Sequence, residues 1–125
     1  MLQKQHHIAI ICSDWEKAKE FYVNKLGFEL TREAYRPAQN DYLRMLSLGE
    51  TTLEIFVKPG YPERVTNPEA KGLRHLAFHV EDIEPAVAWL HSLGIETEPI
   101  GEDRCNGGRY VFFRDPDGLP LELHE

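Results

Sequence analysis

The strongest constraint on the fold of this 125-residue chain is an internal repeat with an offset of 68 positions. Residues of the same type recur in the same order in both halves. The matched pairs are His7 and His75 (75 − 7 = 68), Asp14 and Asp82 (82 − 14 = 68), Glu54 and Glu122 (122 − 54 = 68), and, at the same offset, Ala9 with Ala77, Ala18 with Ala86 and Leu53 with Leu121. An ordered series of this kind indicates two copies of one structural unit. The Leu-Gly pairs at 26–27 and 93–94 are 67 apart, which predicts one residue of slippage in a connection.

The first half has the element order βαβββ. An Ile-rich run at 7–12 predicts a buried strand, Ser13-Asp14 is a helix N-cap signal, and apolar residues at helical spacing predict a helix over 15–26 that ends at Gly27. Further strands are predicted over 28–35, 42–48 and 51–57, with a hairpin turn at Gly49-Glu50 between the last two.

The second half repeats that order after a linker rich in Pro and Gly. A strand over 73–80 precedes Asp82 as a helix cap, and the helix ends at Gly94. The remaining strands are predicted over 95–99, 109–114 and 119–124. The sequence thus predicts an α+β fold in one domain, residues 1–125, with module one at about 4–58, the linker at 59–72 and module two at about 73–125.

The repeat predicts a metal site. Each module has a His on its first strand and a Glu on its last, 47 residues later (54 − 7 and 122 − 75). If the modules pack about a pseudo-twofold axis, His7, Glu54, His75 and Glu122 converge on one point. Imidazole nitrogen and carboxylate oxygen are suitable ligands for Zn, Ni, Co, Mn or Fe. Four such ligands in an octahedral arrangement leave two positions for water or substrate, as a catalytic metal requires.

The apolar context of the two glutamates supports this interpretation. TTLEIF and LPLELH each place one carboxylate inside an apolar strand, where an unpaired charge is costly to bury. The alternative is the opposite strand parity, which would turn both glutamates to solvent. His6, His91 and His124 are expected to be structural, and His79 is expected to pack on the same strand face as His75.

Composition restricts the partners. A net charge of −7 argues against a nucleic-acid or anionic-membrane surface and favours small molecules or other proteins. Cys12 and Cys105 have neither zinc-knuckle spacing nor the density of a disulfide scaffold, which fits a reducing cytoplasm. No leader pattern and no run of ~20 apolar residues occurs, so a soluble, unprocessed cytoplasmic protein is expected.

Several motifs together resemble the vicinal oxygen chelate superfamily of glyoxalase I, bleomycin-resistance proteins and dioxygenases. The motifs are HIAIICSD at 7–14, FY at 21–22 with LGF at 26–28, LE at 53–54, RHLAFHVED at 74–82 and DPDGLPLE at 115–122. They cover nearly the whole chain, which looks most like small bacterial glyoxalase-like, or lactoylglutathione-lyase-like, proteins.

The resemblance implies paired βαβββ modules that form a cup-shaped half-barrel around a divalent metal, commonly in a homodimer. It implies His7, Glu54, His75 and Glu122 as ligands, drawn from one chain or, as in the glyoxalase I branch, from two. An acid at position 54 argues against the three-ligand dioxygenases and fosfomycin-resistance enzymes. It favours the glyoxalase and epimerase branches, where the metal holds two vicinal oxygens and stabilises an enediolate. Glu122 is expected to shuttle the proton.

One position departs from the family pattern. Ile11 stands where glutathione-dependent bacterial glyoxalase I has an Arg, which leaves the thiol open. Arg109 is the favoured residue for an anionic substrate group, with Arg44, Arg64, Arg74 and Arg104 as alternatives. The expected function is that of a glyoxalase-like lyase or isomerase acting on a 2-oxoaldehyde thiol adduct. The alternatives are a metal-dependent dioxygenase or thiol transferase, and a non-catalytic drug- or ligand-binding module.

Overall fold

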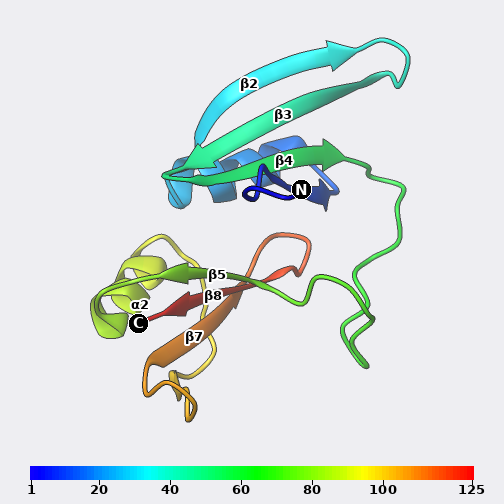
Figure 1. The fold of residues 1–125 in the computed structure, drawn as a ribbon. Helices are drawn as coiled ribbons and strands as arrows, with labels where there is room; N and C mark the ends of the chain where they lie inside the picture. Colours follow the sequence, from blue (N-terminus) through cyan, green and yellow to red (C-terminus); the bar gives the residue numbers. More distant parts are fainter. The chain divides into compact units, whose positions relative to one another are not determined.

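The computed structural model describes all residues, 1–125, in two compact units, Met1–Pro62 and Glu63–Glu125. Each unit contains a helical region and a four-stranded sheet (Figure 1). The predicted α+β class with two βαβββ modules is therefore confirmed. None of the helices is both long enough and apolar enough to span a membrane.

The first unit consists of β1 (Ile8–Cys12), α1 (Trp15–Ala18), the π-helix η1 (Lys19–Lys25), β2 (Glu29–Arg36), β3 (Asp41–Leu48) and β4 (Thr51–Val57). Its strand order is β1-β4-β3-β2, and β1 runs parallel to β4. The second unit consists of β5 (Leu76–His79), α2 (Ile83–Ser92), β6 (Gly101–Glu102), β7 (Arg109–Arg114) and β8 (Pro120–His124). Its strand order is β5-β8-β7-β6, again with a parallel first pair.

Strand register repeats at the offset found in the sequence. In the first unit Ala9 lies opposite Glu54, and in the second Ala77 lies opposite Glu122. Both pairs differ by 68 residues (77 − 9 and 122 − 54). The helices also begin alike, because Asp14 and Asp82 have extended backbones and each side chain accepts a hydrogen bond from a backbone N–H of the first turn.

The offset between matching residues of the two units changes from 68 to 67 within the helical region. α1 and η1 comprise 4 and 7 residues, whereas α2 comprises 10, so the first helical region is one residue longer. Within η1 the chain forms π-type bonds, and Leu26 N–H donates to the carbonyl of Phe21, five residues earlier, at 3.0 Å. Gly27 and Gly94 then end the two regions at positive φ (84° and 72°). The π-helix thus holds the extra residue of the first unit. The offset returns to 68 in the turn before the last strand, because Met45 pairs with Glu54 and Phe112 with Glu122 (112 − 45 = 67, whereas 122 − 54 = 68), so the slippage in a connection lies there.

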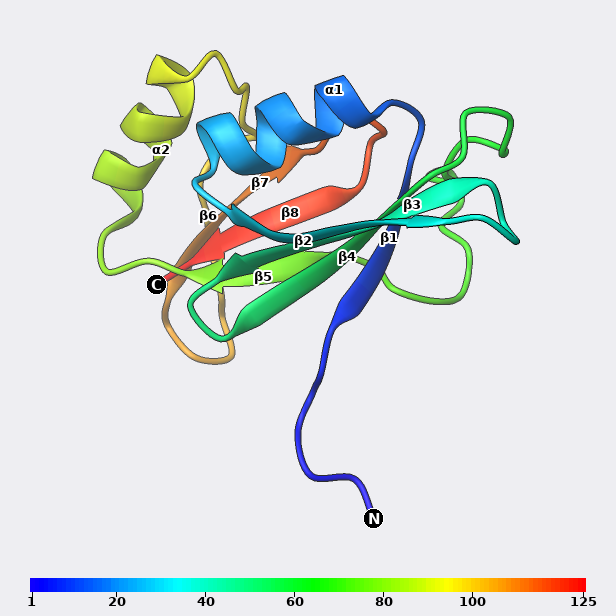
Figure 2. The same cartoon turned by 90° about the horizontal axis from the view of Figure 1, so that it is seen from above.

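The core of each unit lies between its helix and one face of its own sheet. Figure 2 shows α1 running alongside the sheet that contains β2, β3 and β4. In the first unit the buried side chains on these elements are Ile10, Cys12, Ala18, Phe21, Tyr22, Leu46, Leu53 and Ile55. In the second they are Leu76, Ile83, Leu90, Val111, Phe113, Leu121 and Leu123, and α2 contacts β7 and β8.

The predicted strand at 95–99 was wrong. This segment lies outside the strands and forms a single backbone hydrogen bond to β7, from Glu98 N–H to the carbonyl of Phe112 at 2.8 Å. Pro99 has no N–H, so it cannot donate the next bond of a ladder. The edge strand is instead β6, which pairs with Arg109 and Tyr110.

Candidate functional site

Glu54 lies on the face of its sheet that points away from the helix. The Arg44 guanidinium lies 4.3 Å above the Trp15 ring of α1, which identifies the helix-facing side of β3. Arg44 pairs in register with Ile55, which is fully buried. Because side chains alternate along a strand, Glu54 points to the opposite face.

His7 immediately precedes β1, and its side chain contacts Glu54 on the neighbouring strand β4. Its Nε2 lies 3.3 Å from Glu54 Oε2, with 37% of the His side chain and 15% of the Glu side chain exposed. The first predicted pair is therefore in contact.

An equivalent pair forms in the second unit. Glu122 lies opposite Ala77 on β5 and Phe112 on β7, and alternates with the helix-facing residues Leu121 and Leu123. His75 Nε2 lies 2.8 Å from Glu122 Oε2, and the side chains are 27% and 9% exposed. The His75 ring packs edge-on against Phe112, with centroids 5.2 Å apart, which restricts the orientation of the imidazole.

The donor atoms of each pair fit a divalent cation. Two ligand atoms about 2.1 Å from a metal and at right angles to each other are about 3 Å apart. The observed separations of 3.3 Å and 2.8 Å lie on either side of that value. Neutral imidazole and carboxylate are also donor types that zinc, manganese and similar ions accept.

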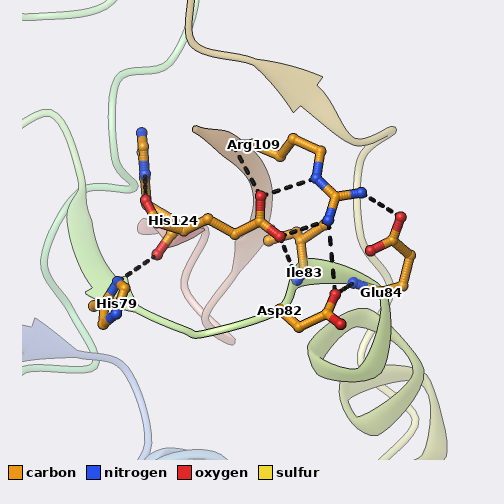
Figure 3. A network of polar contacts seen from close by, with 7 residues as sticks. His79, Asp82, Ile83, Glu84, Arg109 and His124 are labelled. Atoms are coloured by element: carbon orange, nitrogen blue, oxygen red, sulfur yellow. Dashed lines mark hydrogen bonds and ion pairs between the residues drawn. The ribbon is translucent and has the colours of Figure 1, made fainter. Parts of the chain in front are cut away.

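Arg109 lies on the other face of β7. It shares the helix-facing side of the strand with the buried Val111 and Phe113, whereas Phe112 faces Glu122 (Figure 3 shows the surroundings of Arg109). Its Nε and Nη2 donate to the two carboxylate oxygens of Glu125 at 2.9 Å and 2.6 Å. The predicted role of Arg109 in substrate binding stays a prediction.

Two further carboxylates, both at the start of α2, lie close to the Arg109 guanidinium. Arg109 also donates to Glu84 and lies 3.7 Å from Asp82. The cluster of Asp82, Glu84 and Glu125 has the spacing of a cation site, but the guanidinium already supplies the positive charge among them. Arg109, together with the N–H of Ile83, lowers the pKa of Glu125 to about 2. The cluster joins β7 to α2 and is not a candidate metal site.

The family assignment follows from the whole chain. A family model described as the Glyoxalase/Bleomycin resistance protein/Dioxygenase superfamily matches residues 4–123. The chain belongs to this superfamily. The resemblance inferred from the sequence motifs is therefore confirmed.

Relatives within the superfamily extend over the full chain. The protein YwkD of Bacillus subtilis (strain 168) is 56% identical over 126 residues, spanning 100% of this chain and 98% of YwkD. The crystal structure of a glyoxalase family protein from Enterococcus faecalis is 54% identical, has a TM-score of 0.93 and covers 98% of both chains.

More distant relatives carry the names of enzymes. The 2-epi-5-epi-valiolone epimerase of Actinomyces sp is 31% identical, over 94% of this chain and 76% of the epimerase. The glutathione transferase FosA of Serratia marcescens is also 31% identical, over 99% of this chain and 82% of FosA. Superfamily members thus include epimerases and a thiol transferase.

The structure adds a cavity that the sequence did not predict. It lies within the second unit, beside His75 and Phe112, and three arginines are among its lining residues, Arg64, Arg74 and Arg114. Arg64 and Arg74 were expected as alternative residues to bind an anionic substrate group. That all three arginines line one cavity had no signal in the sequence. Arg64 lies in the linker rich in Pro and Gly, where no periodicity predicts which side chains meet.

Proposed function

We propose that this protein is a metal-dependent enzyme that moves a proton next to a carbonyl of a small substrate with two vicinal oxygens. Its reaction would be that of a glyoxalase-like lyase or isomerase, with a 2-oxoaldehyde thiol adduct as the model substrate. The observation that carries the proposal is the His–Glu pair that recurs in both units at the same strand register. The similarity to an epimerase supports the same class of proton-transfer chemistry.

In this proposal His7, Glu54, His75 and Glu122 hold one divalent cation, which is zinc, nickel, cobalt, manganese or iron. The cation, when bound, would polarise the substrate carbonyl and favour negative charge on its oxygen. The two pairs supply two neutral nitrogen and two carboxylate donors, so the charge of a divalent cation is balanced. The need to neutralise two partly buried carboxylates supports this assignment.

Glu122, released from or weakly held by the cation, is assigned as the group that takes the proton and returns it. Its side chain is the more enclosed of the two glutamates, at 9% against 15% exposed, so less water competes for the carboxylate. The edge-on contact between His75 and Phe112 holds the neighbouring imidazole in place, so the carboxylate has a fixed partner. General acid–base catalysis of this kind contributes about 10²–10⁴-fold to the rate.

The test compares Glu122→Gln with a matched control, Glu50→Gln, which makes the same charge change at an exposed hairpin turn. Metal-free protein is reloaded with each candidate metal and assayed on methylglyoxal with several thiols, and solvent deuterium incorporation next to the carbonyl is followed by NMR. We expect Glu122→Gln to lose at least about 10²-fold in rate and Glu50→Gln to keep wild-type activity. Equal turnover by both variants, or no turnover with any metal and thiol, contradicts the proposal.

Metal analysis separates the enzyme from a non-catalytic ligand-binding module. We expect about one divalent metal per chain, lost in His7→Ala, because each ligand contributes to the binding free energy. A protein that binds no divalent metal would be a binding module. The similarity to FosA makes transfer of a thiol to a small substrate the second candidate, identified by a thiol-containing product that does not revert.

The proposed setting is the cytoplasm, with the protein as a homodimer. Neither cysteine forms a disulfide, with Cys12 buried and Cys105 exposed, which suits a reducing compartment. Sedimentation of the metal-loaded protein measures the oligomeric state.

A further inference from the structure

We propose that the cavity beside His75 is a subsite for an anionic group of the substrate, a carboxylate or phosphoryl group, bound by Arg64, Arg74 and Arg114. This inference rests on the proposed function, because it assigns a negative charge to the substrate of that same site. It differs from the role predicted for Arg109, which lies on the opposite face of the sheet.

The cavity lies on the same sheet face as Glu122. It has a volume of about 170 Å³ and is lined by residues that include His75, Phe112, Arg114 and Pro120. Phe112 pairs in register with Glu122, and Arg114 pairs with Pro120, two positions along each strand. Two residues of strand correspond to about 7 Å. A small molecule that reaches from the His75–Glu122 pair into the cavity therefore extends its far end toward the arginines.

The lining of the cavity carries excess positive charge. Arg74 pairs with Glu69 at 3.0 Å and Arg114 pairs with Glu98 at 3.1 Å, which accounts for both lining glutamates. Arg64 has no carboxylate partner and instead donates through Nη2 to the backbone carbonyls of Leu73 and Arg74, at 2.6 Å and 3.0 Å. Among the lining side chains, three guanidinium groups therefore face two carboxylates.

The anchoring of Arg64 orients its remaining donors. A guanidinium has five N–H donors in a rigid plane, and only Nη2 is used by the two carbonyls. The donors on Nη1 are not used by these carbonyls and lie in the same plane, so they suit an oxygen of a bound anion. Phe112 supplies an apolar wall on which the carbon skeleton of a small acid can pack.

The other two arginines can turn toward a ligand at little cost. The Arg74–Glu69 pair has side chains 69% and 49% exposed, and the Arg114–Glu98 pair 50% and 51%. Exposed ion pairs contribute little to stability, so exchanging a glutamate for a bound anion costs little. Arg109, in contrast, has its guanidinium held by Glu125 on both oxygens, so an anion would have to displace a bidentate partner.

The test titrates inorganic phosphate, and separately acetate, into metal-free protein while the amide NMR signals of Arg64, His75 and Phe112 are followed. Arg64→Gln is compared with Arg32→Gln, a control with the same charge change at an exposed position of β2 in the first unit. Arg114→Gln is a second variant, in which the only interaction lost from the ligand-free protein is the exposed ion pair with Glu98, so its fold should be little affected. Thermal unfolding establishes that each variant is folded.

We expect saturable shifts in wild type and Arg32→Gln, and a dissociation constant about tenfold higher in Arg64→Gln and Arg114→Gln, since a charge-assisted hydrogen bond is lost. Tighter binding of phosphate indicates that the anionic group of the substrate is a phosphoryl group, and tighter binding of acetate indicates a carboxylate. Unsaturable shifts in wild type, or equal affinity in all four proteins, overturns the subsite. The titration needs neither metal nor turnover, so saturable binding to an inactive protein would remove the proposed function and leave the subsite intact.

Discussion

Gly101 offers a direct test of how closely the second sheet is packed. A Cβ at this position would lie 2.5 Å from Cζ, 2.7 Å from the hydroxyl oxygen and 2.9 Å from Cε2 of Tyr110. Its φ is not positive, so Gly101→Ala introduces a steric conflict without backbone strain. The ring it meets stacks on His124, with centroids 6.3 Å apart, and contacts Phe112 edge-on at 5.6 Å. The tyrosine therefore has neighbours on both sides that resist its movement.

The magnitude follows from two opposing effects. Overpacking of this kind costs about 1–3 kcal/mol, and the lower unfolded-state entropy of Ala returns about 0.4–1 kcal/mol. Because Tyr110 is only half buried, its ring can yield, and we expect Gly101→Ala to lower the free energy of unfolding by about 0.5–2 kcal/mol. In a Tyr110→Ala background the space is open, so the same change should be neutral or slightly stabilising.

The measurement is urea unfolding of the four proteins of this cycle, followed by far-UV circular dichroism. Gly60→Ala is the matched control, because a Cβ there meets nothing within 4 Å. It should stabilise the protein by about 0.4–1 kcal/mol. If Gly101→Ala is as stable as Gly60→Ala, or is equally destabilising with and without the tyrosine ring, the steric account of Gly101 is refuted.

Two titratable groups give further predictions. Arg109 and the N–H of Ile83 lower the pKa of Glu125 from 4.5 to about 2. The stabilising contribution of the Glu125 carboxylate is therefore present above pH 4.5 and is lost as the pH falls toward 2. Arg109→Gln should raise this pKa in a carboxyl NMR titration, and an unchanged pKa would contradict the assignment. The carbonyl of Glu125 and then Asp103 raise the pKa of His124 above 6.5, so its contribution is complete below pH 6.5 and is lost as the pH rises through the folded-state value. Asp103→Asn should lower the imidazole pKa measured by NMR, and no change would show that the carboxylate does not act on it.

The repeat made most of the fold predictable. The hydrophobic pattern and the fixed offset located the strands that carry Glu54 and Glu122, and each glutamate contacts the histidine of its own module. These features are local in sequence or repeat within it, so they can be read from one chain. Whether the two pairs share a cation stays a prediction.

The partners of the arginines were not predictable in the same way. Arg109 was expected to bind an anionic substrate group, and its carboxylate partners, from the start of α2 and from Glu125, had no signal in the sequence. Arg64 lies in a segment without hydrophobic periodicity, and its partners are backbone carbonyls. Such contacts depend on tertiary structure, since long charged side chains have no fixed direction in sequence.

The π-helix η1 indicates where this fold accepts a change of length. One additional residue within a helix is absorbed by a wider turn, so the positions before and after it keep their neighbours. One additional residue between Leu53 and Glu54 would exchange the two faces of β4 and direct the carboxylate into the apolar side. Among natural sequences of this family, single-codon insertions and deletions are therefore expected in the helices and turns, and the strands that carry the two His–Glu pairs should align without gaps.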